Sequence, residues 1–307
     1  MLNWTDGVEI ANIYKQNKKS DLQPEQITAS HREGFGSQNT SGSQSCIMGD
    51  NTITKIKIKP SMTHNNFDQC FVSNKDNNLI IEDNTFELPD GYTMRISPTH
   101  DKDQNMRMVI IAPSGSGKST FAKNFILDYK KKYPNKDVFL FSRHDKDPSI
   151  DEAKPIRINL SEQEIIESIK KKEPVFTNKN LAKSLVIFDD TFTAESKILT
   201  SFWDGLATDL YQNGRKLGID LIFIMHNTNY SKTRYLMSEA SHYVFFLRAG
   251  SRAMYTRLLD GYLGFKDKKI QKKLFDLPTR YIIFSNTSPQ FIMTENQVFD
   301  QSLLFND

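Results

Sequence analysis

The stretch that most constrains the fold is MVIIAPSGSGKSTFAKNFI, residues 108–126. An apolar run of strand length leads into a loop of Gly and Ser, and an amphipathic segment typical of a helix follows. The chain therefore has to place a tight glycine turn between a buried strand and a helix.

The turn itself, APSGSGKS at residues 112–119, fits the phosphate-loop pattern with Ala in place of the usual first Gly. In that pattern the glycines let backbone N–H groups surround phosphate oxygens, Lys118 reaches the β and γ phosphates, and Ser119 ligates Mg²⁺. We therefore expect ATP and Mg²⁺ as cofactors. The alternative is a Gly/Ser turn that merely precedes a helix. The expected nucleotide contacts are Ser114, Gly115, Ser116, Gly117, Lys118, Ser119 and Thr120.

From residue 105 onward, strand-like and helix-like segments alternate. Strands this apolar, separated by helices, indicate an α/β fold with a mainly parallel central sheet flanked by helices. The segment RYIIFSNTSPQFIMTEN instead predicts a C-terminal antiparallel hairpin. Expected strands cover residues 107–112, 137–142, 184–189, 220–226, 242–248 and 280–285, and expected helices cover 118–131, 161–172, 195–213 and 266–275.

The first part of the chain is polar and rich in Asn, Ser and Lys. We predict a partly flexible N-terminal extension over residues 1–78 and an ATPase domain over 79–307. HREGFGSQNTSGSQS, residues 31–45, has the composition of a flexible linker. Alternating Ile and Lys predict a strand at 53–58 that ends at Pro60, and NLIIE and YTMRIS predict two further strands.

Composition removes several classes of function. Every apolar run is of strand length, so we expect no membrane span. The six His residues show no zinc-ligand spacing, and the net charge of +3 is too small to indicate nucleic-acid binding by itself. Cys46 and Cys70 form no CxxC pair, which fits a reducing compartment.

A pair of acids follows the apolar run in SLVIFDD, residues 184–190. Beside a phosphate loop, Asp189 would bind Mg²⁺ through water, and Asp190 would orient and deprotonate the attacking water. The doublet favours hydrolysis over phosphotransfer, because a kinase has no need to activate water. Acids at a strand end also serve as helix caps or lie in solvated loops.

A later strand, in NGRKLGIDLIFIMHNTNY, ends in His226 and Asn227. In ATPases with a strand inserted between the phosphate-loop and metal-binding strands, this end lies near the γ-phosphate. Strand alternation lets only one of the two side chains face the nucleotide. His226 is our candidate to detect hydrolysis, and the alternative is that it simply caps a buried strand.

The ordered set of APSGSGKST, LVIFDD, NGRKLGIDLIFIMHNTNYSKTRYL and HYVFFLRAGSRAM resembles the genome-packaging ATPases of large DNA viruses and virophages. These poxvirus-type enzymes belong to the FtsK/HerA superfamily of P-loop NTPases. The resemblance implies a RecA-like motor, usually a homo-oligomeric ring, that uses ATP hydrolysis to drive double-stranded DNA into a capsid without reading its sequence. It also implies capsid vertex or portal proteins as partners, and a location at the viral assembly site in the host cytoplasm and in the virion.

By position in that family, Lys118 and Ser119 bind nucleotide and Mg²⁺, and Asp189 and Asp190 are the metal-binding and water-activating acids. Arg215 is the candidate to reach a neighbouring subunit's γ-phosphate, which can accelerate hydrolysis by roughly 10³ to 10⁵. The sequence departs from the family at His226, where many relatives have Gln, and at Lys216, where they often have His.

Basic runs at residues 130–136 and 266–273 are candidate DNA contacts, although exposed lysines are more often only solvated. Three other functions remain open. They are a different FtsK/HerA-type pump or helicase, a capsid-vertex scaffold that binds ATP without turnover, and a nucleoside kinase, for which we find no acceptor pocket or basic lid.

Overall fold

The computed structural model divides the chain into two compact units, Met1–Thr99 with Leu259–Asp307, and His100–Leu258. The first 99 residues are thus grouped with the C-terminal segment. The predicted boundary at residue 78, between an extension and an ATPase domain over 79–307, stays a prediction. The structure describes residues 8–16, 22–23, 54–60, 67–73, 78–81, 85–88, 92–98, 105–173, 175–191, 196–226, 234–287 and 290–301.

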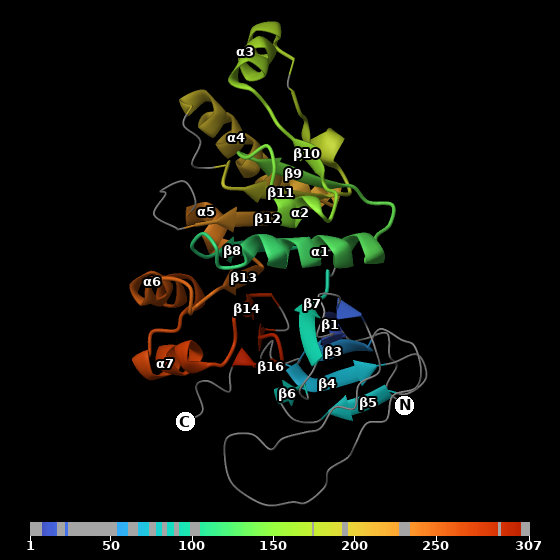
Figure 1. Cartoon of the computed structure of the whole chain (residues 1–307), viewed down its shortest axis with the longest axis vertical. Coiled ribbons are helices and arrows are strands. Elements are labelled where there is room, and N and C mark those ends of the chain that lie inside the picture. The colour runs from blue at the N-terminus through green and yellow to red at the C-terminus, as the bar shows by residue number, and fades with distance from the viewer. Residues whose placement is uncertain are drawn as a thin grey trace, which may run out of the picture. The chain divides into compact units, whose positions relative to one another are not determined.

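The unit His100–Leu258 contains a parallel sheet with strand order β10-β9-β11-β12-β8-β13 (Figure 1). The predicted α/β class with a mainly parallel central sheet is confirmed. Its central strands are buried over nearly their whole length because helices cover both faces. The strands are β8 (Arg107–Ile111), β9 (Val138–Ser142), β10 (Ile156–Ile158), β11 (Leu185–Asp189), β12 (Asp220–Met225) and β13 (His242–Phe245).

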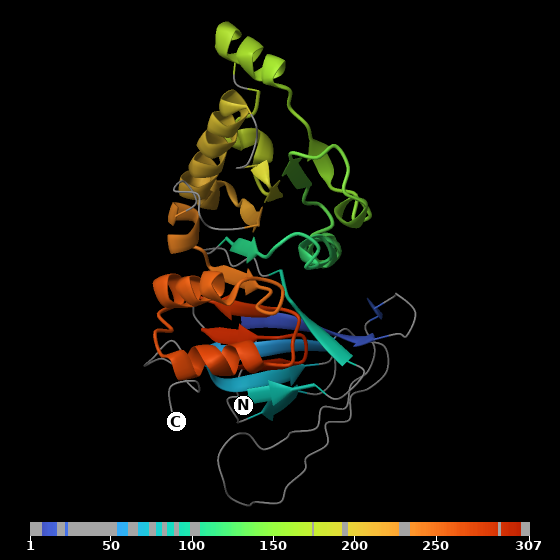
Figure 2. The same cartoon turned by 60° about the vertical axis from the view of Figure 1, so that its left-hand side comes forward.

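Helices α1 (Lys118–Lys132) and α4 (Lys197–Asn213) lie on opposite faces of this sheet (Figure 2). The chain passes through α1 from β8 outward to β9 and then returns through α4 from β11 to β12. Right-handed crossovers in opposite directions require opposite faces. The other helices are α2 (Pro148–Asp151), α3 (Glu162–Lys171), α5 (Arg234–Ser238), α6 (Arg252–Leu263) and α7 (Lys268–Asp276).

Three phenylalanines form a ladder across neighbouring strands. Phe141, Phe188 and Phe223 occupy matching register positions, and successive ring centroids are 5.2 Å apart. On α4, Trp203 lies 5.3 Å from the Phe141 ring and Tyr211 lies 5.9 Å from the Phe223 ring. This aromatic layer packs α4 against the sheet. Its central residue, Phe188, immediately precedes Asp189 in the chain.

The other unit contains an antiparallel sheet in the order β2-β1-β3-β4-β5, with β7 also paired to β1. The strands predicted at residues 53–58, in NLIIE and in YTMRIS are confirmed as β3, β5 and β7. The linker-like residues 31–45 lie outside the described residues. The bounds are β1 (Val8–Gln16), β2 (Leu22–Gln23), β3 (Thr54–Pro60), β4 (Phe67–Ser73), β5 (Asn78–Ile81) and β7 (Tyr92–Ile96).

The predicted C-terminal hairpin is confirmed as β14 (Ile282–Ser285) and β15 (Phe291–Met293), which pair antiparallel. It continues through β16 (Gln297–Asp300) to β6 (Thr85–Glu87). Within the part of the chain that the structure describes, no helix combines the length and apolar character needed to cross a membrane.

We expect Phe188→Ala to lower the free energy of unfolding by about 3–5 kcal/mol, because it removes the central ring of the ladder from a fully buried site. Denaturant unfolding of the two proteins measures the difference. Phe202→Ala is the control, since Phe202 lies next to Trp203 but is only half-buried. A loss at Phe188 no larger than the loss at Phe202 would show that the ladder does not stabilise the sheet.

Candidate nucleotide site

The predicted site residues meet at one edge of the parallel sheet. The phosphate loop follows β8. Asp189 is the last residue of β11 and Asp190 comes directly after it, and His226 follows β12. Because β8, β11 and β12 run in the same direction, their carboxyl ends lie at the same edge. This edge is where α/β sheets bind ligands.

The phosphate loop has a conformation that requires glycine. Gly115 and Gly117 have φ angles of 75° and 104°, which other residues rarely adopt. The hydroxyl of Ser116 donates to the carbonyl of Pro113 at 2.7 Å and closes the turn. Helix α1 begins directly at Lys118 without a side-chain cap at its first turn. Its first N–H groups can therefore receive an anion.

Lys118 is buried, with 6% of its surface exposed. Its ammonium donates to the carbonyl oxygens of Ala112 at 2.7 Å and Pro113 at 2.9 Å and lies 3.1 Å from Nδ1 of His226. Burial lowers the pKa of Lys118, and the charges of Asp190 and Asp189 oppose that shift. The amino group is thus held at the loop by groups that a phosphate could replace.

His226 joins Lys118 to Asp190. Its Nε2 lies 2.5 Å from Oδ2 of Asp190. An ammonium has only donors, so Nδ1 of His226 must accept from Lys118, and the ring proton is on Nε2, facing the carboxylate. The structure therefore brings His226 to the site, whereas Asn227 lies outside the described residues.

Asp189 is buried and accepts a hydrogen bond of 3.2 Å from Ser142 at the end of β9. Burial, and then the neighbouring Asp190, raise the pKa of Asp189 to about 6. Asp190 leaves the strand with a φ of 53°, a left-handed conformation that is uncommon for residues other than glycine. This turn lets two adjacent acids lie at one site, Asp189 against β9 and Asp190 against His226.

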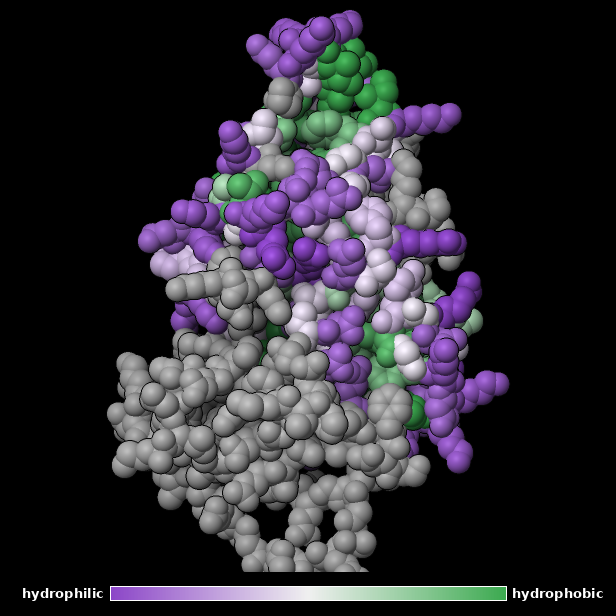
Figure 3. All heavy atoms as spheres, turned by 180° about the vertical axis from the view of Figure 1, so that it is seen from behind, coloured by the Kyte–Doolittle hydropathy of each residue, from purple (hydrophilic) through white to green (hydrophobic). Residues whose placement is uncertain are grey.

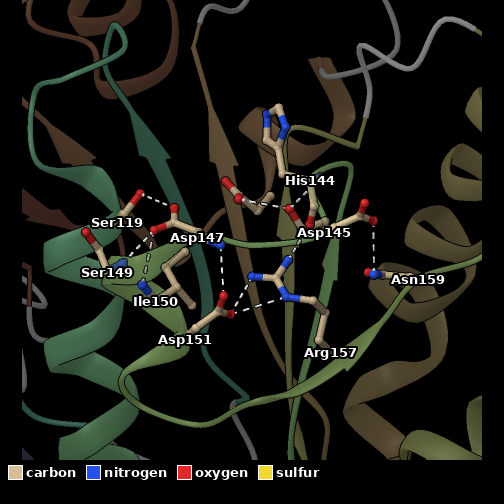
Figure 4. Close-up of polar contacts among 11 residues, drawn as sticks. Ser119, His144, Asp145, Asp147, Ser149, Ile150, Asp151, Arg157 and Asn159 are labelled. Atoms are coloured by element: carbon tan, nitrogen blue, oxygen red, sulfur yellow. Dashed lines mark hydrogen bonds and ion pairs between the residues drawn. The ribbon is translucent and has the colours of Figure 1, made fainter.

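One acid at this edge was missed by the sequence analysis. Asp147, in the loop between β9 and α2, accepts a hydrogen bond of 2.8 Å from the hydroxyl of Ser119 (Figure 4). Its charge also contributes to the raised pKa of Asp189. The sequence did contain a sign of this acid. A parallel strand at 137–142 places its carboxyl end at this edge, so the acids in the loop after it could have been predicted to lie near the site.

The oxygens at this edge suit Mg²⁺. Ser119 and Asp189 supply hydroxyl and carboxylate oxygens, the ligands that hard cations prefer. Among the described residues, no group of three or more His, Cys, Asp or Glu could hold a metal ion by itself. Magnesium in nucleotide sites keeps several waters and takes phosphate oxygens as ligands.

The remaining predicted residues lie in different places. Ser114 and Thr120 are exposed on the loop and the first turn of α1. Arg215 is exposed in the 3₁₀ turn Gly214–Leu217, which precedes β12. It therefore lies at the amino edge of the sheet, roughly 20 Å along the six-residue strand from His226. The structure does not bring Arg215 to the phosphate loop of its own chain.

We expect a double-mutant cycle of His226→Ala and Asp190→Ala to give a coupling of about 1–3 kcal/mol in unfolding free energy, because the contact is short and Asp190 is only 12% exposed. Denaturant unfolding of the four proteins measures it. The control cycle uses Glu167 and Lys171 on α3, which lie 3.6 Å apart with both side chains 66% exposed, and should give no more than about 0.5 kcal/mol. Equal couplings would mean that His226 does not stabilise Asp190.

No protein-family model matches the chain. Solved structures with similar folds include the genome packaging NTPase B204 from Sulfolobus turreted icosahedral virus 2 in complex with ATP-gammaS. It has a TM-score of 0.41 and 12% identity, over 64% of this chain and 98% of that one. Another is the cytoplasmic domain of the Thermomonospora curvata type VII secretion ATPase EccC, with a TM-score of 0.40 and 16% identity, over 62% of this chain and 25% of that one.

A curated relative gives the stronger match. "Uncharacterized protein V3" of Sputnik virophage is 30% identical over 190 residues, which cover 61% of this chain and 74% of the relative. This relative agrees with the resemblance drawn from the ordered motifs, which includes virophage proteins. The chain belongs to the family of this Sputnik virophage protein.

Proposed function

We propose that this chain is a Mg²⁺-dependent ATPase that translocates double-stranded DNA and packages a viral genome. The observation that carries the proposal is the connected series Lys118–His226–Asp190 at the mouth of the phosphate loop. A loop that only capped a helix would not need a buried lysine that is linked through a histidine to Asp190. This linkage favours turnover over the alternative of an ATP-binding scaffold.

In the proposed mechanism the N–H groups of the loop and α1 surround the phosphates. Lys118 exchanges its contacts with Ala112 and Pro113 for the β and γ phosphates. Bound Mg²⁺, held by Ser119 and through water by Asp189, would neutralise charge developing on the phosphate oxygens. Asp190 accepts the proton of the attacking water, and His226, which contacts both Lys118 and Asp190, changes partner when the γ-phosphate leaves.

Arg215 completes a neighbour's site in this proposal. Its position at the amino edge prevents it from reaching its own phosphate loop. A homo-oligomeric ring that joins the amino edge of one subunit to the carboxyl edge of the next would place it against ATP. Exposed apolar side chains offer surface for such contacts, because hydrophobic residues gather over α3 at the top of Figure 3, where Ile169 is 67% exposed.

Helix α7 is the proposed contact with DNA. Ile270, Gln271 and Leu274 are buried on one side of the helix, and its lysines face outward. Its exposed lysines are Lys268, Lys269, Lys272 and Lys273, with Lys266 just before it. Regularly spaced ammonium groups suit a phosphate backbone read without base specificity.

The other basic run, at residues 130–136, is largely committed to the protein itself. Lys130 donates to the carbonyl oxygens of Ala153 and Lys154 at 3.0 and 2.6 Å. Lys136 lies 4.6 Å from the ring centroid of Tyr133, and burial lowers its pKa. These side chains favour a structural role for this run, so α7 is the better candidate.

The packaging role is supported by the ordered motifs, and the virophage relative supports a viral origin. It implies capsid vertex or portal partners and action at the assembly site in the host cytoplasm, with retention in the virion. A cellular-type pump or helicase would share the nucleotide site and differ in its accessory domains.

We expect ATP hydrolysis per subunit to rise with protein concentration and again with long double-stranded DNA, because the active site forms between subunits. Lys118→Ala and Arg215→Ala should each lower turnover at least about 10³-fold. A mixture of these two variants should recover activity, since an Arg215→Ala subunit keeps a complete phosphate loop and its Lys118→Ala neighbour supplies the arginine. A steady-state phosphate-release assay measures the wild-type protein, the two variants and their mixture.

Asp190→Asn separates the alternatives. In a motor it abolishes hydrolysis while a non-hydrolysable ATP analogue still binds, whereas wild-type binding without turnover in the presence of DNA would favour the scaffold. Turnover that ignores DNA and protein concentration would indicate a monomeric NTPase or kinase. A mixture with no recovered activity would exclude Arg215 as a residue that acts on a neighbour.

We expect replacement of Lys268, Lys269 and Lys272 by Gln to reduce the slope of log Kobs for duplex DNA against log salt by about one unit for each lysine. Fluorescence anisotropy with duplexes of two unrelated sequences measures the slope and checks that it does not depend on sequence. The control replaces Lys170, Lys171 and Lys179, which are equally exposed elsewhere. If both triple variants have the wild-type slope, α7 is merely solvated.

A further inference from the structure

Asp147 is part of a chain of hydrogen bonds that has no explanation in the phosphate-loop motif. Its Oδ1 accepts the backbone N–H groups of Ser149 at 2.8 Å and Ile150 at 3.3 Å, and so caps α2. Its Oδ2 accepts the hydroxyl hydrogen of Ser119 at 2.8 Å. One carboxylate thus joins the start of α2 to the proposed metal ligand on α1, as Figure 4 shows.

Asp151 and Arg157 hold Asp147 in place. The backbone N–H of Asp147 donates to Oδ2 of Asp151 at 2.8 Å. Arg157, on β10, binds Oδ1 of Asp151 through Nη2 at 2.5 Å and through Nε at 3.2 Å, and donates from Nη1 to the carbonyl of His144 at 2.6 Å. The guanidinium therefore binds both ends of the segment 144–151, which consists of the loop after β9 and helix α2 (Figure 4).

This arrangement determines the orientation of the Ser119 hydroxyl. A hydroxyl has one hydrogen and two lone pairs. When the hydrogen is directed at Asp147, the lone pairs face away from that carboxylate and are free for a cation. Groups that orient a metal ligand in this way usually change metal affinity by 10- to 100-fold when they are replaced.

We propose that Asp147 is a positioning residue for the metal site, which orients Ser119 toward Mg²⁺ and links that ligand through Asp151 to Arg157. The inference rests on the proposed binding of Mg²⁺ and ATP at the phosphate loop. It adds a third acid to the site, from the loop after β9, beyond the two acids that follow β11.

Asp147→Asn tests the proposal in the full-length protein. Asn caps a helix about as well as Asp, so α2 is preserved, but its amide is a poorer and uncharged acceptor for the Ser119 hydroxyl. The dissociation constant of a non-hydrolysable ATP analogue is measured by calorimetry in MgCl₂ and in EDTA. We expect the affinity gained from Mg²⁺ to fall about tenfold or more, and the affinity in EDTA to change by less than about threefold. Electron paramagnetic resonance of Mn²⁺ with the analogue should show the same weakening.

Asp145→Asn is the matched control, because Asp145 lies in the same loop and is exposed, with a bond of 3.3 Å to Asn159. It should keep the wild-type ratio of the two affinities. Asp147→Ser, which keeps a capping hydroxyl, is the second variant if Asp147→Asn does not fold. A wild-type ratio in either folded Asp147 variant would overturn the proposal and leave the ATPase intact. Wild-type protein that does not bind the analogue would instead overturn the proposed function.

Discussion

The rest of the site depends on how the buried ammonium group of Lys118 is compensated by its neighbours. A lysine held at 6% exposure loses hydration and must be compensated by nearby acceptors. Two carbonyls of the phosphate loop, the ring of His226 and the charges of two acids provide that compensation. These groups come from the carboxyl ends of three parallel strands, β8, β11 and β12, so the sheet must be assembled in the correct order before the lysine can be buried.

The charges of the two acids at the end of β11 are not compensated in the way that the charge of Lys118 is. Asp189 and Asp190 repel each other, and burial adds to the cost of ionising Asp189. Asp190 also takes up a left-handed backbone conformation. Such local strain is typical of sites arranged for a ligand, and a bound cation would offset the repulsion between the two carboxylates. Stability and readiness to bind therefore oppose each other at this edge.

Much of this site could be predicted from the sequence because its signals are local. The glycine and lysine spacing of residues 112–119 and the acids after an apolar run need only neighbours in the chain. Asp147 could not be predicted as a partner of Ser119, because that bond joins residues 28 positions apart. In the fold, β1 was missed because a bulge between Glu9 and Ala11 disturbs its pairing with β3, and Ile10, Ala11, Ile13 and Tyr14 are all buried without strict alternation.

Strand β12 has a consequence for how a ring of these subunits would work. His226 follows its carboxyl end and Arg215 precedes its amino end, and the strand is buried between β11 and β8 along its length. A strand bonded on both sides cannot stretch or bend independently of its sheet. It would behave as a rigid lever, so that a tilt of the sheet when phosphate leaves one pocket displaces the arginine presented to the next. The two ends of β12 would then move together, with no flexible loop needed between the pocket of one subunit and the arginine presented to the next.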